Sequence, residues 1–423
     1  MEEEKKNKVN KEVIIAVLLV LAMAVIGFAM FFKRGDDKVK EEPKKTYVPN
    51  DVKLDGLALS FLKLETNKEN LVYSPLSIKY ALNMLRDGAN GTTKEEIDKV
   101  IGDDTPTKYE NIDKVLSLAN SVFIRDTYKD YVKDEYISGL KDKYNAEFFY
   151  DEFKDASNVN NWIEEKTFNI IKDMLKDSDV QNPNLEMILV NALAIDMEWM
   201  NRFDAENTRG REFTLENGEK VNAAMMHQST ELKDYKYYKE EDFSAVTIPL
   251  KDYDGTGLEL VVIMPNKEDL HSVVTSDNFD ETVKNVLGNL HTVDNQELSI
   301  TLPRFEFDYS LNLVDDLKTL GIKAAFDDNK ADFSNMSERE LVVGDARHKA
   351  NIKVSEKGIK AGAATIIMMF DKAMAVEKEQ VYLTFDKPFM FMIRDKETEE
   401  VWFTGNVYEP LLWDEVKDDY DYR

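Results

Sequence analysis

The stretch Val354–Ala373, which reads VSEKGIKAGAATIIMMFDKA, constrains the fold of this chain more than any other. Its first part contains the charged pair Glu356-Lys357, but from Ala361 to Phe370 it carries no charge, although 32% of the whole chain is charged. In an extended strand, alternate side chains point to opposite faces. One face of this stretch would then be entirely uncharged: Ile359, Ala361, Ala363, Thr365, Ile367 and Met369. A strand of this kind is suited to the middle of a sheet.

An ordinary buried strand or helix is the simplest interpretation of such a run, because periodicity alone does not separate the two. Two features weigh against it. Gly358 and Gly362, with the small residues around them, make a poor helix and only a modest strand. The run also ends at Ala373 without a turn signal, and a second strand-like run follows at Gln380–Phe385. An ordinary core element therefore explains the stretch poorly.

The composition sets the class of protein. The chain has 423 residues and 43% of them are hydrophobic, which is enough for a sizeable core in a domain of roughly 370 residues. The formal net charge of −27 argues against a nucleic-acid binder, which needs a basic face. The absence of cysteine excludes disulfides and zinc–thiolate sites. These numbers favour a large acidic globular domain and leave its compartment open.

The N-terminus predicts a membrane anchor. Residues 1–12 form a polar head, the run Val13–Phe32 is uninterrupted and apolar, and residues 33–50 form a charged linker. An apolar run of this length spans a bilayer as one helix. An uncleaved signal anchor is favoured over a cleaved signal peptide, because no small-residue cleavage site closes the run. Lysine and arginine are more numerous after the span than before it, so the positive-inside rule does not itself place the domain outside.

The rest of the chain has the pattern of an α+β protein. The spacing of apolar residues predicts helices from about Asp51 to Leu175, and strand-like runs follow from Met187. Within the helical part, residues 70–75 predict a short strand that runs into a helix. Ser74 is placed to cap that helix, with a proline at its first position.

Further local signals are specific enough to test. Thr93 and Glu96 predict a capping box for the following helix. Leu311–Leu320 predicts an amphipathic helix that Gly321 ends. The closing segments predict strands at Lys349–Val354, Val381–Phe385, Phe389–Ile393 and Trp402–Val407.

The sequence carries no recognisable catalytic or metal-binding motif. It contains no G-x-S-x-G, H-E-x-x-H, phosphate-binding lysine loop or G-x-G-x-x-G. With 82 acidic residues, a pair of carboxylates carries no information. The four histidines are far apart, and none has a partner at metal-ligand spacing: His227, His271, His291 and His348. We therefore predict no catalytic residue, no metal and no cofactor.

Several motifs, in a fixed order, resemble those of the serpin family of serine protease inhibitors. The segment Asn70–Ile78, NLVYSPLSI, resembles the family's N-x-x-x-S-P-x-S-I. The segment Asn191–Phe203 resembles its N-A-x-x-x-x-x-x-W-x-x-x-F. HKA at residues 348–350 precedes the Glu-Lys-Gly of the opening stretch, and KPF follows at residues 387–389. The resemblance covers nearly the whole domain and is therefore specific.

The resemblance implies a fold of about nine helices around three mostly antiparallel sheets, with a reactive loop exposed at one end. It covers residues 51–410, and residues 411–423 follow as an acidic tail. In this family a target protease attacks the loop and forms an acyl-enzyme, and the cut loop then inserts into the main sheet as a new strand. The native state is then a kinetic trap whose stability is a rate. The uncharged face of the opening stretch is what a strand that is first solvated and later buried requires.

The resemblance carries three sets of site residues onto this sequence. Trp199 matches a tryptophan near the top of the main sheet (the breach), although a core aromatic residue fits it equally well. The shutter, a polar cluster beneath the strands that must part, is matched by Ser74, Ser77, Asn191 and His348. Inhibitors usually carry Thr or Ser at the position of Ile359, whose bulk is expected to slow insertion without forbidding it. The whole hinge comprises Glu356, Lys357, Gly358, Ile359, Lys360, Ala361, Gly362, Ala363, Ala364 and Thr365.

The family's usual spacing from Glu356 ends at Lys372 and predicts Lys372–Ala373 as the scissile bond. A lysine there suits a trypsin-like protease with a carboxylate in its pocket. The register stays open, because the stretch after Ala373 is longer than usual. Residues that would suit a chymotrypsin- or elastase-like protease in another register are Phe370, Met369 and Met374.

The sequence thus predicts a monomeric serpin that inhibits an extracellular serine protease, with one molecule consumed per protease. Val13–Phe32 would hold it at the outer face of a membrane, or it is secreted if that segment is cleaved. The leading alternative is a non-inhibitory serpin that acts as a binding or chaperone-like protein, which Ile359 keeps open. A cysteine protease as target also stays open. An enzyme is a distant third, and no nucleic acid is expected as a partner.

Overall fold

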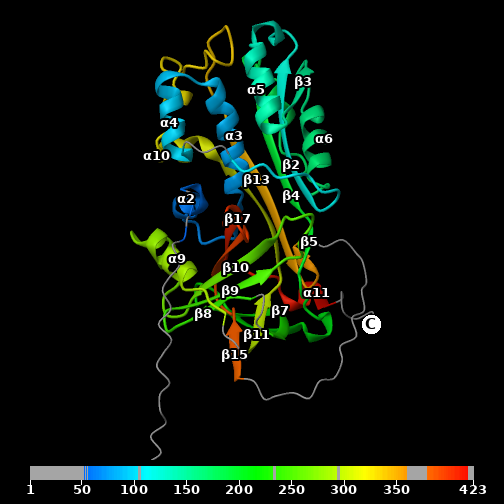
Figure 1. Ribbon diagram of the computed structural model, residues 1–423, viewed down its shortest axis with the longest axis vertical. Helices are drawn as coiled ribbons and strands as arrows, with labels where there is room; N and C mark the ends of the chain where they lie inside the picture. The colour runs from blue at the N-terminus through cyan, green and yellow to red at the C-terminus, as the bar shows by residue number, and fades with distance from the viewer. Residues whose placement is uncertain are drawn as a thin grey trace, which may run out of the picture. The chain divides into compact units, whose positions relative to one another are not determined.

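Figure 1 shows the fold of the chain in a computed structural model. Contacts between α-carbons group Pro49–Arg423 into one unit and Met1–Val48 into another. The predicted polar head, membrane anchor and linker fall outside the part that the structure describes. The described residues are Val52, Leu54 and the ranges 56–102, 106–231, 235–292, 296–359 and 379–417.

The described part begins with a helix, a short strand and a second helix. α2 (Leu57–Leu64) buries most of its residues, and β1 (Leu71–Tyr73) is buried throughout. α3 (Pro75–Gly88) starts as the sequence predicts. Ser74 is its N-cap, the Ser74 Oγ accepts a hydrogen bond from the backbone N–H of Ser77, and a proline occupies the first helical position.

The capping box predicted for the next helix, α4 (Gly91–Ile101), is wrong. The N-cap is Asn90, so Thr93 and Glu96 lie inside the helix. The Thr93 hydroxyl accepts from the backbone N–H of Asp332 at 3.0 Å. One carboxylate oxygen of Glu96 accepts from two consecutive backbone N–H groups at 2.7 Å each. Both side chains therefore satisfy the backbone of a distant segment, a use that a local motif does not reveal.

Three further strands form one sheet with β2 in the middle, parallel to β3 and antiparallel to β4. β2 and β3 lie where the sequence predicts helices, whereas β4 begins at Met187, where strand-like runs are predicted. α5 and α6 connect them, and Figure 1 places these elements in the upper part of the domain. β2 is buried along nearly its whole length, so it lacks the alternation that reveals a strand from sequence. The bounds are β2 Leu116–Arg125, α5 Asp134–Tyr144, β3 Glu147–Asp151, α6 Ser157–Lys166 and β4 Met187–Ile195.

The remaining described strands form three sheets, and the predicted closing strands are among them. The six-stranded sheet has the order β1-β17-β16-β10-β9-β8, with β8 Tyr237–Lys239, β9 Phe243–Pro249, β10 Leu258–Pro265, β16 Phe389–Asp395 and β17 Val401–Val407. One four-stranded sheet has the order β15-β11-β7-β6, with β6 Arg209–Thr214, β7 Lys220–Glu231, β11 Gln296–Pro303 and β15 Glu379–Thr384. The other has the order β12-β13-β14-β5, with β5 Met197–Glu198, β12 Phe305–Asn312, β13 Arg347–Ser355 and β14 Gly358–Ile359.

The described part of the chain has five more α-helices. The helix predicted at Leu311–Leu320 is α10, which starts slightly later, behind an Asn312 cap. Gly321 ends it with a φ of 119°, a left-handed conformation that glycine adopts without strain. The bounds are α7 Asp177–Val180, α8 Leu270–Val274, α9 Phe279–Gly288, α10 Leu313–Leu320 and α11 Trp413–Val416.

The core lies between the six-stranded sheet and the strands β12 and β13. β10 and β16 are buried along their whole length. Phe305 of β12 is fully buried, and its ring centroid lies 5.9 Å from that of Phe389 and 5.5 Å from that of Phe391, both on β16. These aromatic contacts fix β12 and β13 to a rigid support.

The main sheet is divided between β4 and β13. Among the described residues no backbone pairing joins these two strands, so the strands form four sheets where the sequence predicts three. The rest agrees with the predicted class, since helices and mostly antiparallel strands occur together and only β2–β3 and β11–β15 are parallel. We call the unpaired space between β4 and β13 the slot.

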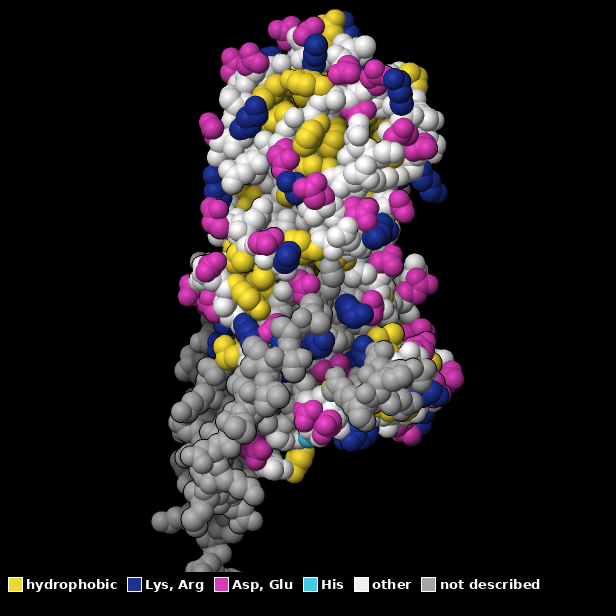
Figure 2. All heavy atoms as spheres, turned by 90° about the vertical axis from the view of Figure 1, so that its right-hand side faces the viewer, with side chains coloured by type: hydrophobic (Ala, Val, Ile, Leu, Met, Phe, Trp, Pro, Cys, Tyr) yellow, Lys and Arg dark blue, Asp and Glu magenta, His cyan; other side chains and the backbone are white. Residues whose placement is uncertain are grey.

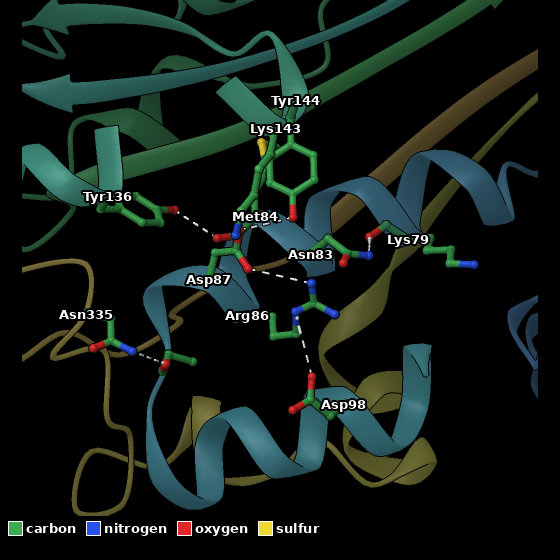
Figure 3. A network of polar contacts seen from close by, with 11 residues as sticks. Lys79, Asn83, Met84, Arg86, Asp87, Asp98, Tyr136, Lys143, Tyr144 and Asn335 are labelled. Carbon is green, nitrogen blue, oxygen red and sulfur yellow. Dashed lines mark hydrogen bonds and ion pairs between the residues drawn. The ribbon is translucent and has the colours of Figure 1, made fainter. Parts of the chain in front are cut away.

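Figure 3 shows a polar network that joins α3 to α4 and α5. The largely buried guanidinium of Arg86 lies 3.6 Å from the carboxylate of Asp87 and 3.7 Å from that of Asp98. Asp87 also accepts from the ammonium of Lys143 at 2.8 Å and from the hydroxyl of Tyr144 at 3.1 Å. Burial and the charge of Asp87 raise the pKa of Tyr144, so its hydroxyl remains a donor. The network thereby fixes α3 to the block formed by β2, β3 and β4.

Candidate functional site

The hinge turn, Ser355–Gly358, connects β13 to β14 and sends the chain back into the sheet. β14 pairs antiparallel with β13 on one side and with β5 on the other. Gly358 has a φ of 156°, and a Cβ at this position would lie 2.1 Å from the carbonyl oxygen of Met197. Only glycine lets the two backbones approach so closely. The first hinge residues therefore already form a short central strand.

Trp199 donates hydrogen bonds to backbone carbonyl groups of the hinge turn. Its indole Nε1 donates to the carbonyl of Ser355 at 2.7 Å, and its backbone N–H donates to the carbonyl of Lys357 at 3.1 Å. The backbone N–H of Phe203 donates to the carbonyl between them, that of Glu356, at 3.0 Å. Trp199 is completely buried. The tryptophan predicted near the top of the sheet thus lies against the hinge itself.

The carboxylate of Glu356 is buried beneath the hinge turn. One oxygen accepts from the hydroxyl of Thr208 at 2.8 Å, and the other lies 4.0 Å from Nε of the buried Arg304. Sequence reasoning did not single out Thr208 or Arg304 as site residues. Their sequence signals are slight: Thr208 lies five residues after the Asn191–Phe203 motif, and Arg304 is a lone cation in a strand-like run.

The slot holds a small, mostly apolar cavity directly beyond the end of β14. Ile359, the hinge residue that departs from the usual Thr or Ser, is buried and lines this cavity. The sheet therefore accommodates the Ile359 side chain at the position where insertion of the loop would begin. The other lining residues include Leu193, Ala194 and Ile195 of β4 and Asn351, Ile352 and Lys353 of β13.

Three of the four predicted shutter residues lie together at the start of α3. The backbone N–H of Ser74 donates to Nε2 of His348 at 3.0 Å, and the backbone N–H of Ser77 donates to the Ser74 hydroxyl at 3.0 Å. His348 is buried, and burial lowers its pKa to about 4. The imidazole is therefore neutral at pH 7 and has a free lone pair on Nε2 to accept the bond.

Asn191, the fourth shutter residue, has a different partner. Its side-chain amide donates to the side-chain oxygen of Asn120 at 2.8 Å, and Asn120 donates in turn to the carbonyl of Tyr144 at 2.9 Å. The two asparagines lie opposite each other on β4 and β2. None of the hydrogen bonds found in the described part of the chain joins Asn191 to the other three shutter residues. Asn120, buried and central to this contact, was not predicted.

Acid is expected to destabilise the native state through His348. Its native pKa of about 4 lies below the ordinary value of 6.5, so between these pH values only the unfolded chain binds the extra proton. The stabilisation is fully present above pH 6.5 and is lost as the pH falls through this window, by about 3 kcal/mol in total. Urea unfolding at a series of pH values measures this fall.

Two variants separate the role of His348 as a hydrogen-bond acceptor from the effect of its protonation. His348→Gln retains an acceptor for the Ser74 N–H but cannot be protonated, so it should lose this part of the pH dependence. His348→Ala leaves that N–H buried without an acceptor and should speed the loss of monomer on warming to latent or polymeric forms. Unchanged rates of monomer loss in His348→Ala, or a wild-type pH profile in His348→Gln, would count against the predicted role.

Several predicted residues fall outside the described residues. They are the distal hinge (Lys360, Ala361, Gly362, Ala363, Ala364 and Thr365) and the scissile bond Lys372–Ala373. Within the described ranges, no group of three or more His, Cys, Asp or Glu side chains is placed to hold a metal ion. Within the same ranges no helix is long and apolar enough to cross a membrane, and the predicted anchor Val13–Phe32 lies outside them.

Sequence comparison identifies the family. The family model described as Serpin (serine protease inhibitor) matches residues 56–410. An uncharacterized serpin-like protein of Thermococcus kodakarensis is 31% identical over 371 residues, which cover 83% of this chain and 83% of that protein. Neuroserpin of Gallus gallus is 30% identical over 380 residues, which cover 82% of this chain and 88% of that protein. The chain belongs to the serpin family, as its motifs predict.

Solved structures share the fold. Tengpin, a thermophilic serpin in its native state, has a TM-score of 0.69 at 24% identity, covering 88% of this chain and 98% of that chain. Thyroxine-binding globulin in complex with thyroxine has a TM-score of 0.68 at 24% identity, covering 84% of this chain and 99% of that chain. Serpins are in general protease inhibitors rather than enzymes, although some, such as thyroxine-binding globulin, are non-inhibitory.

Proposed function

We propose that this serpin inhibits a serine protease by trapping it as a covalent acyl-enzyme. The observation that carries the proposal is the hinge. β14 has entered the sheet between β13 and β5, while β4 and β13 remain unpaired below it around an apolar cavity. A chain segment that follows Ile359 in the same direction would complete the sheet.

The chemistry belongs to the protease. Its catalytic serine attacks the scissile carbonyl, an ester bond forms to the serine oxygen, and the peptide C–N bond breaks as its amine leaves with a proton. The new carboxyl-terminal end of the loop is then tied to the protease and no longer to β15. Adding it to β14 as a strand satisfies the free backbone groups on the facing edges of β4 and β13. The protease is carried along before water can cleave the ester.

The sequence favours a trypsin-like target that cuts at Lys372–Ala373, with chymotrypsin- and elastase-like proteases as the alternatives in another register. The domain acts as a monomer outside the cell, anchored by Val13–Phe32 or secreted if that segment is cleaved. Charged side chains of both signs are interspersed on the face in Figure 2, and the described residues visible there form no continuous basic field. A nucleic-acid partner is therefore not part of the proposal.

Incubation of the full-length chain, in mild detergent, with trypsin, chymotrypsin and elastase tests the proposal. A complex that survives denaturing electrophoresis is the expected result, and the N-terminus of the released peptide fixes the scissile bond. If each protease cleaves the loop and keeps its full activity, these proteases treat the loop as a substrate only.

A non-inhibitory binding function is the second candidate. The feature that favours it is Ile359, an apolar β-branched residue where inhibitors usually carry Thr or Ser. In the structure, however, Ile359 is buried between β13 and β5, which supports the inhibitory function. Cleavage without trapping by any serine or cysteine protease, with no gain of heat resistance, would favour the binding function.

A further inference from the structure

The register of β14 fixes the path along which the inserted strand would lengthen. Ile359 pairs with Val354 on β13 and with Met197 on β5. In antiparallel pairing each added residue faces one residue earlier on both neighbours. The seventh residue after Ile359 would then face Arg347 on β13 and Val190 on β4. Arg347, the first residue of β13, therefore marks the far end of the slot.

A segment that connects α6 to β4 covers this path. We call residues 167–180 the strap. Near the hinge, Ile170 and Ile171 of the strap line the cavity directly ahead of β14. Further along, the ammonium of Lys349 on β13 donates to the strap carbonyl of Lys172 at 3.1 Å. The strap thus contacts the slot along its length.

The strongest contact of the strap lies at the far end of the slot. The guanidinium of Arg347 donates to both carboxylate oxygens of Asp179, at 2.7 Å and 3.1 Å. Bidentate arginine–carboxylate pairs of this kind are stronger and more directional than ion pairs with a single hydrogen bond. The bond to Arg347 lowers the pKa of Asp179. Asp179 also accepts from the backbone N–H of Lys176 at 2.8 Å, which fixes its rotamer.

Three residues of the strap have a left-handed backbone. Phe168, Asn169 and Asp173 have φ values of 51°, 61° and 48°. Asn and Asp adopt this region more readily than other residues, so the strain lies at Phe168. Such a conformation persists only where the surroundings hold it. The contacts of Arg347 and Lys349 with the strap are therefore in a position to hold it against its local preference.

We propose that the Arg347–Asp179 ion pair is a clasp that holds the strap across the slot and sets the rate at which the inserted strand lengthens. The strap leads into β4 through residues 181–186, whereas Arg347 is on β13. Moving β4 away from β13 therefore stretches or breaks this pair. The clasp slows spontaneous insertion of an intact loop, and it slows insertion after cleavage by the same factor. This inference rests on the proposed function, since it concerns the same insertion step.

A synthetic peptide that copies residues 361–372 tests the clasp without a target protease. The full-length chain is incubated with the peptide, and the rate of complex formation is followed by native electrophoresis. Losing one partly exposed ion pair worth about 1 kcal/mol should speed annealing about fivefold in Arg347→Gln and in Asp179→Asn. Asp179→Asn retains an acceptor for the Lys176 N–H, so it leaves α7 capped.

A control variant makes the result specific. Glu306→Gln removes a comparable pair, Lys353–Glu306 at 2.6 Å, which lies between β13 and β12 and does not cross the slot. Its annealing rate should equal that of the wild type.

The outcomes separate the two proposals. Wild-type rates in both Arg347→Gln and Asp179→Asn overturn the clasp, and so does an equal acceleration in Glu306→Gln. If the wild-type chain accepts no peptide at all, while a form cleaved in its loop gains no heat resistance, it is the proposed function that fails.

Discussion

Gly358→Ala is expected to turn an inhibitor largely into a substrate. The new Cβ would lie 2.1 Å from the carbonyl oxygen of Met197 and 2.7 Å from the Cα of Glu198, so β14 cannot keep its pairing with β5. The cleaved loop then lacks the paired β14 from which insertion starts. Insertion becomes slower, so more of the acyl-enzyme is hydrolysed before the protease is trapped. The number of inhibitor molecules consumed per protease should rise about tenfold, which corresponds to about 1.4 kcal/mol in the competition between the two steps. Titration of the trapped protease measures it.

Gly344→Ala is the matched control. The same substitution there meets no atom within 4 Å and requires no unusual backbone angle, so the stoichiometry should stay at the wild-type value. A wild-type stoichiometry in Gly358→Ala would mean that the β14 pairing plays no part in inhibition.

Glu356→Lys is expected to lower the free energy of unfolding by about 3–5 kcal/mol. The substitution removes the acceptor of the Thr208 hydroxyl and places a second cation beside the buried Arg304. Leaving a buried charge without its counter-ion is among the most costly single changes in a folded protein. Urea unfolding at neutral pH gives the loss, and native electrophoresis after warming shows whether monomer disappears faster.

Glu306→Lys reverses the charge of an exposed pair instead. Glu306 and Lys353 lie 2.6 Å apart, and more than a third of each side chain is exposed. The expected loss is within about 1 kcal/mol. Equal losses in the two variants would show that burial of Glu356 beneath the hinge does not matter.

Local sequence signals predicted the helix ends well. Ser74 caps α3 before its proline, and Gly321 ends α10, because helix ends depend on a few neighbouring residues. Sequence periodicity did not reveal β2, because this strand is buried on both faces and so lacks the alternation of apolar and polar residues. The Thr93–Glu96 pair failed for another reason, since both side chains bond to a segment more than two hundred residues away.

The family motifs single out the candidate site residues, whose roles stay predictions, and the structure adds their contacts. The Trp199 indole contacts the hinge turn, and the backbone of Ser74 contacts His348. The hydrogen bond of Thr208 to Glu356 and the ion pair of Arg304 with Glu356 join residues far apart in the chain, as does the Arg347–Asp179 clasp. Such long-range pairs cannot be predicted from sequence periodicity, because the spacing of their residues in the sequence follows no pattern.

The melting midpoint of the full-length chain before and after cleavage in its loop tests the central claim most directly. Insertion of the cut loop fills the slot with a paired strand, and each kcal/mol gained raises the midpoint of a domain this large by about 2 °C. We predict a rise of well over about 10 °C, with the cleaved chain still held together as one folded unit. An unchanged or lower midpoint would show that the cut loop stays outside the sheet and would contradict the insertion mechanism.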